Sequence, residues 1–252
     1  MKRGIYIIAF LCLINNCRGD VPDIVIKRFR QIAVLIQENK VVELSKMIAY
    51  PLKRPNPLPD ITTAEKFVAY YPTLIDDVFK RQIKLYNDSD IFEHHGYYGL
   101  VGGPFSGEIW LDENGKIISI NYSSPAEIAL SKQLTKSIQA HIYPSVNTWV
   151  QNIVVCKSQS LLIRVDSTKN GIRYVCWTKG HSSSEKPDLV LDHGIEEAQG
   201  TEGGWTWTFV NGDWTYVVDD VETCESDKGC GFFLRLLYKD NLKSSVKLSE
   251  IK

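Results

Sequence analysis

Three aromatic rings share one face of a short segment, Trp205-Thr206-Trp207-Thr208-Phe209, because successive side chains of a strand point to opposite faces. After an Asn-Gly turn, Trp214 and Tyr216 return with the same spacing. A row of exposed rings of this kind stacks on sugar rings, which would make it a glycan-binding platform. The same alternation fits a half-buried strand whose aromatic face belongs to a core. The candidate ligand-binding residues here are Trp205, Trp207, Trp214 and Tyr216.

Adjacent histidines follow a glutamate at Glu93-His94-His95. Histidine is the side chain most often used as a general base near neutral pH. One of these histidines, with Glu93 or Glu108 as its partner, is a candidate base or ligand contact. The alternative is that they are surface or hydrogen-bonded histidines at the start of a strand, where His94 and His95 would face opposite sides.

Other motifs that carry chemistry are absent or incomplete. The glycine-rich stretch 99–107 is not followed by Lys-Ser/Thr or by a helix start, so we interpret it as a bent strand rather than a phosphate loop. The cysteines and histidines do not have zinc-ligand spacing. We expect no metal and no cofactor, assign no catalytic residue, and favour a protein that is not an enzyme.

The N-terminal segment resembles an export signal. Lys2 and Arg3 precede an uncharged, apolar run over 4–14, which at about ten residues is too short to span a bilayer. We expect 1–19 to be a signal peptide cleaved after Gly19. The alternative is cleavage before Cys17, because Ile14-Asn15-Asn16-Cys17 is similar to a lipobox. The exported protein would be periplasmic in the first case and an outer-membrane or cell-surface lipoprotein in the second, with a lipid on Cys17 as its one link to a membrane.

The charge balance excludes one class of partner. The formal net charge of −1 becomes −4 once Lys2, Arg3 and Arg18 leave with the signal segment. A nucleic-acid partner would require a basic face. We therefore expect no nucleic acid, and consider an envelope glycan, a small molecule or another protein as the partner.

Four of the six cysteines lie in the last two-fifths of the chain. An even number of cysteines in an exported protein indicates disulfides. Four cysteines allow three connectivities, and we favour the two that close local loops, Cys156–Cys176 and Cys224–Cys230. The alternative is that they are buried free thiols.

The first half of the chain shows helical periodicity. Apolar residues recur with helical spacing from Pro22 to Glu38, and Ser124-Pro125-Ala126-Glu127 is typical of a capping box that opens a helix continuing to about residue 142. Between them we expect short helices over 41–48 and 62–83, then strands over 92–101, 107–111 and 116–122.

The second half shows short β runs separated by Gly, Asn and Asp turns. Eight such runs in about 100 residues favour a small sandwich or barrel. The expected strands are 152–156, 161–166, 173–178, 189–191, 205–210, 214–218, 232–238 and 245–248.

Two family resemblances follow from this order of elements. Residues 22–124, with Phe29, Ile32, Trp110 and the 107–122 hairpin, resemble the NTF2-like (cystatin-like α+β) family, which implies a curved sheet that wraps a long helix into a cone. That family includes enzymes and binding domains, so it implies a fold more than a function. The Gly-rich loop 200–204 and the hairpin 205–218 are similar to small exported β-barrel lysozyme inhibitors.

The sequence therefore predicts an α+β protein, an NTF2-like helix-plus-curved-sheet cone followed by a small all-β sandwich or barrel. The expected parts are a signal peptide (1–19), an α+β domain (20–124), a connecting helix and linker (125–149) and a disulfide-containing β domain (150–252). We expect an exported bacterial envelope protein that is a non-catalytic binding module. The alternatives are an NTF2-like hydrolase or isomerase and a lysozyme-inhibitor-like protein.

Overall fold

The computed structural model describes residues 21–94, 96–100, 108–200, 203–222, 224 and 229–252. The expected signal segment, Cys17, His95 and most of the glycine-rich stretch lie outside the described residues.

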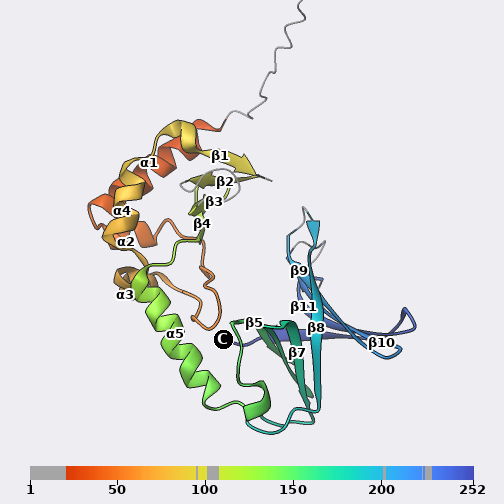
Figure 1. Cartoon of the computed structure of the whole chain (residues 1–252). Coiled ribbons are helices and arrows are strands. Elements are labelled where there is room, and N and C mark those ends of the chain that lie inside the picture. The colour runs from red at the N-terminus through yellow and green to blue at the C-terminus, as the bar shows by residue number, and fades with distance from the viewer. Residues whose placement is uncertain (1–20, 95, 101–107, 201–202, 223, 225–228) are drawn as a thin grey trace, which may run out of the picture.

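Helices α1 (Asp23–Gln37), α2 (Val41–Ser45), α3 (Ala64–Leu74) and α4 (Asp77–Lys84) form the first part of the chain (Figure 1). Side-chain caps fix where they begin: Thr63 accepts a hydrogen bond from the Lys66 amide, and Asp76 from the Phe79 amide. The apolar stripe of α1, which includes Val25, Phe29 and Ile32, is fully buried in one core with α2, α3 and α4.

A small antiparallel sheet completes this half. Its order is β1 (Phe92–His94), β2 (Tyr97–Leu100), β3 (Ile109–Leu111) and β4 (Ile117–Ile120). A short 3₁₀ turn, η1 (Asp88–Asp90), precedes it. Leu100, Ile109 and Ile117 pack into the core that contains α1.

The predicted α+β architecture with an NTF2-like cone is wrong. The protein is mostly β, with a closed eight-stranded barrel and this four-stranded sheet. Each strand of the sheet has three or four residues, which is about 10–14 Å of chain. Such a sheet is too short to wrap the 15 residues of α1, which extend about 22 Å.

Helix α5 (Pro125–Gln139) connects the two halves of the chain (Figure 1). Ser124 caps it by accepting from the Glu127 amide, and Pro125 occupies its first turn. The 3₁₀ turn η2 (Pro144–Val146) follows. Ile142, Val146 and Trp149 then pack against Val175 and Trp177 of the barrel. The segment after α5 is therefore held on the barrel's outer wall.

The remaining described strands form the closed antiparallel barrel, in the order β10-β11-β12-β5-β6-β7-β8-β9. Ser249 and Glu250 close it by pairing with Lys157 and Cys156. Alternate side chains, among them Val165, Tyr174 and Leu234, fill its interior. The strands are β5 (Gln151–Lys157), β6 (Leu161–Thr168), β7 (Gly171–Thr178), β8 (Leu189–Ala198), β9 (Trp205–Asn211), β10 (Trp214–Val221), β11 (Gly231–Tyr238) and β12 (Asn241–Glu250).

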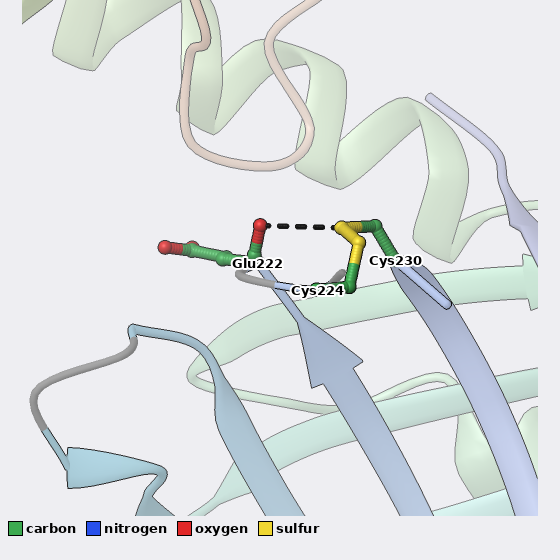
Figure 2. Close-up of a disulfide and its surroundings, with 3 residues drawn as sticks. All are labelled: Glu222, Cys224 and Cys230. Carbon is green, nitrogen blue, oxygen red and sulfur yellow. Dashed lines mark hydrogen bonds between the residues drawn. A yellow bond between two sulfur atoms is a disulfide. The ribbon is translucent and has the colours of Figure 1, made fainter. Parts of the chain in front are cut away.

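The barrel carries a disulfide between Cys224 and Cys230, as the sequence predicts (Figure 2). Their Cα atoms lie 5.5 Å apart. The Sγ of Cys230 is 3.4 Å from the carbonyl oxygen of Glu222. An oxidised sulfur has no hydrogen to donate, so we regard this as a van der Waals contact. The disulfide therefore joins the end of β10 to the start of β11.

The predicted Cys156–Cys176 disulfide is wrong, because both residues are free, buried thiols. Cys156 on β5 and Cys176 on β7 pair with the same residue, Ile163, from opposite sides of β6. Two strand spacings separate their Cα atoms by about 10 Å, whereas a disulfide needs less than about 7 Å.

Candidate functional site

The aromatic face of the 205–216 hairpin lies inside the barrel. Trp207 and Phe209 are 3 % and 1 % exposed and belong to the barrel core. Trp205 is 44 % exposed because it lies where β9 begins. The rings therefore do not form one exposed row: Trp207 and Phe209 are core residues, whereas Trp205 is partly exposed.

The two returning aromatic residues lie towards the other end of the barrel, where Trp214 is 39 % exposed. Tyr216 contacts Tyr174 in the interior, with 5.7 Å between ring centroids. Trp214 starts β10 and lies 5.1 Å from the ring of Tyr238. Since Trp214 pairs with Asn211 while Trp205 pairs with Asp220, Trp205 and Trp214 lie at opposite ends of the barrel.

The structure does not bring His94 next to Glu108, and His95 lies outside the described residues. Phe92 and Trp110 both pair with Gly99, so β1 and β3 run in the same direction and these two residues lie at the same level of the sheet. His94 is then four residues further along the sheet than Glu108, about 13 Å. Burial raises the pKa of Glu108. Glu93 accepts a hydrogen bond from the Gly96 amide at 2.6 Å.

One cavity of about 460 Å³ occupies the mouth of the barrel next to Trp205. Asp220 lies between Trp205 on β9 and Phe232 on β11 in the strand register. The proline-rich loop 51–60 covers this mouth, and Asn56 Nδ2 donates to the Ile153 carbonyl at 2.9 Å. Burial raises the pKa of Asp220 to about 6, and the negative charges of Glu222 and Glu250 add to the shift.

A second cavity, of about 440 Å³, lies between α5 and the outer wall of the barrel. We call it the wall pocket. It is mainly apolar. Its lining comes from α5, the segment that follows α5, the proline-rich loop, β5 and β6. Its size is in the range of small-molecule sites. The lining includes Pro57, Ile138, Ile142, Trp149, Val155, Leu162, Arg164 and Ile251.

A buried charge cluster lies beside the wall pocket. Asp166 on β6 pairs in register with Asn152 on β5 and Arg173 on β7. Its Oδ1 accepts from Asn152 Nδ2 at 2.8 Å and from Arg164 Nη2 at 2.9 Å, and its Oδ2 accepts from Arg173 Nη2 at 3.2 Å. The Asp166 side chain is fully buried. The cluster therefore rigidly positions Arg164.

Arg164 is the charged side chain that connects this cluster with the wall pocket. Its side chain is 4 % exposed, and its guanidinium lies 4.2 Å from the ring centroid of Trp149. Its Nε is buried and has no hydrogen-bond partner among the described residues. The wall pocket thus combines an apolar lining with one buried cation.

The sequence predictions did not include Arg164, Asp166 or Arg173. A signal was present, because Arg164 and Asp166 lie within the expected strand 161–166 and Arg173 opens the expected strand 173–178, and both strands are otherwise mainly apolar. Charged side chains are seldom buried without partners, so such a pattern indicates a paired cluster.

The described residues contain no group of three or more metal-ligating side chains. Within the same part of the chain, no helix has the length and apolar character needed to cross a bilayer.

The chain matches no protein-family model, curated protein or solved structure.

Proposed function

We propose that the protein is a non-catalytic binding module for a small, mainly apolar molecule, which it holds in the wall pocket. The observation that carries this proposal is the pocket itself, a cavity of about 440 Å³ whose lining is mainly apolar. Pockets that combine apolar walls with a few convergent polar groups are the usual sites of small ligands. Of the three partner classes expected from the sequence, this lining favours the small molecule over a glycan.

The wall pocket supports this function better than the barrel mouth does. The loop 51–60 and its hydrogen bond to β5 cover the mouth, and Glu196, Asp220 and Glu250 bring negative charge to it. Among the described residues, no carboxylate side chain lines the wall pocket. Burying an apolar molecule there is favourable by about 25 cal/mol for each Å² of apolar surface removed from water.

The disulfide supports the proposed location outside the cytoplasm. The Cys224–Cys230 bond closes a short loop between β10 and β11. Disulfides persist in oxidising compartments and are rare in the cytosol. We therefore propose an exported envelope protein, in which the binding site faces an extracytoplasmic supply of its ligand.

A neutral fluorescent dye tests the pocket. N-phenyl-1-naphthylamine brightens in apolar surroundings, and we expect it to bind the protein with one saturable site. Ile138 on α5 lines the pocket and is 38 % exposed, so Ile138→Trp should fill the cavity and abolish dye binding. The matched control is Ile128→Trp on the same helix, because Ile128 is 44 % exposed and does not line the pocket. Equal dye binding by both variants would place the dye elsewhere and overturn the proposal.

A further inference from the structure

We infer that the ligand of the wall pocket carries a carboxylate, and that this carboxylate pairs with the guanidinium of Arg164. The inference rests on the proposed function, because it names the chemical class of the molecule bound at the same site. Three observations carry it: the charges that line the pocket, the charge balance of the buried cluster and the unused donors of Arg164.

The ionisable side chains that line the wall pocket are all basic. They are Arg164, His141 and Lys252, and no Asp or Glu lies among the lining residues. Lys252 Nζ already donates to Asp60 Oδ1 and to the Arg54 carbonyl, each at 2.5 Å. His141 is exposed, and its Nδ1 lies 2.8 Å from the Ser137 carbonyl oxygen. Arg164 is thus the buried cation of the lining.

The buried cluster has one positive charge in excess. Two guanidinium groups, of Arg164 and Arg173, share the single carboxylate of Asp166. Arg173 also donates to the carbonyls of Val146 and Thr148 at 2.9 and 3.1 Å. A buried charge is costly unless it is paired. An anion in the wall pocket would balance the excess charge on the Arg164 side of the cluster.

The guanidinium of Arg164 has the donors needed to bind this anion. Of its five N–H groups, one on Nη2 donates to Asp166. The other four have no protein acceptor among the described residues, and Nε is also buried. The guanidinium lies over the ring of Trp149, and this cation–π contact favours its position. A carboxylate matches the planar fork of arginine and forms two parallel hydrogen bonds with it.

Two ligands of equal chain length, one with a carboxylate and one with a hydroxyl group, distinguish the contribution of the charge from that of the apolar chain. Decanoate and 1-decanol are each used to displace N-phenyl-1-naphthylamine from the protein at pH 7.5. The alcohol is the less polar molecule, so an apolar pocket alone favours 1-decanol. We expect decanoate instead to bind at least tenfold more tightly. Arg164→Met should remove this preference, so that decanoate no longer binds more tightly than 1-decanol, and Asp166 keeps Arg173 and Asn152 as partners in this variant.

The outcomes distinguish this inference from the proposed function. Displacement of the dye by both ligands with no preference for decanoate overturns the carboxylate but leaves the apolar site. Failure of the dye to bind, or binding unaffected by Ile138→Trp, overturns the site itself. If Arg164→Met does not fold, Arg164→Lys keeps the charge without the planar fork. We expect it to bind decanoate with an affinity between the wild-type value and that for 1-decanol, and an unchanged affinity would overturn the paired geometry.

Discussion

Arg54 in the proline-rich loop and Glu127 in the first turn of α5 form a buried, two-pronged ion pair. Arg54 Nε donates to Oε1 at 2.8 Å and Nη2 to Oε2 at 2.5 Å, and the two side chains are 2 % and 0 % exposed. Arg54 also donates to the carbonyls of Ile120 and Tyr122. This pair anchors the loop that supplies Asn56 and Pro57 to the wall pocket.

We predict that Arg54→Met destabilises the protein by about 3–5 kcal/mol, because it leaves the carboxylate of Glu127 buried without its cation. The measurement is the free energy of unfolding by chemical denaturation. The double variant Arg54→Met/Glu127→Met should lose less than the two single variants together, since no unpaired charge remains.

The matched control is a similar pair at the surface. Arg30 on α1 and Asp88 form an ion pair whose side chains are both exposed. Exposed pairs contribute about 0–1 kcal/mol, so Arg30→Met should have little effect. A loss as large as that of Arg54→Met would contradict the role that we assign to burial.

The second prediction concerns which cysteines react with an alkylating reagent. Alkylation in denaturant without a reductant should modify Cys156 and Cys176 but not Cys224 and Cys230, which should react only after reduction. In the native protein Cys156 should resist alkylation, because its side chain is buried in the barrel and burial raises the pKa of its thiol. Peptide mass spectrometry reads out all four sites. A Cys156–Cys176 peptide linked by a disulfide would contradict the barrel register.

Local signals in the sequence predicted much of the secondary structure. The helix expected from Pro22 to Glu38 is α1, and the capping box at Ser124 opens α5. The segment expected as one strand over 92–101 is instead divided into β1 and β2 by a turn at Gly96, where φ is +80°. Glycine adopts such a φ without strain, so Gly96 is the feature of the sequence that predicts this turn.

The tertiary arrangement was harder to predict, because it depends on which strands become neighbours. The alternation at Trp205 to Phe209 fits an exposed face and a buried face equally well, and only closure of the barrel makes it the interior. The Cys156–Cys176 pairing failed for the same reason, since β6 lies between the two strands. The wall pocket joins β6 to a helix and a loop that are distant in the chain, so no local pattern marks it.

Gly194 on β8 gives a third prediction, about packing inside the barrel. A Cβ at this position would fall inside contact distance of the ring of Phe209. We expect Gly194→Ala to destabilise the protein by about 1–3 kcal/mol, the usual effect of overfilling a packed core. Thermal or chemical unfolding measures the loss.

A compensating change tests the cause of that loss. Phe209→Leu removes ring atoms that the new methyl group would meet. The double variant Gly194→Ala/Phe209→Leu should therefore be more stable than the sum of the two single losses predicts. Additive losses would show that Gly194 is required for another reason.

Asp220 at the barrel mouth gives a prediction about pH. Burial, followed by the charges of Glu222 and Glu250, raises its pKa to about 6, while Lys53 opposes the shift. An aspartate in the unfolded chain has a pKa of about 3.9. Between these two values the folded protein binds the proton more tightly, so the contribution of Asp220 to stability falls as pH rises from about 4 to 6.

Asp220→Asn should remove this dependence and stabilise the protein by about 1–3 kcal/mol at pH 7, with little effect at pH 4. Unfolding by denaturant at the two pH values measures both effects. Asp192→Asn, on an exposed position of β8, controls for the loss of one negative charge. An equal gain from both variants at pH 7 would mean that net charge, and not the buried position of Asp220, is responsible.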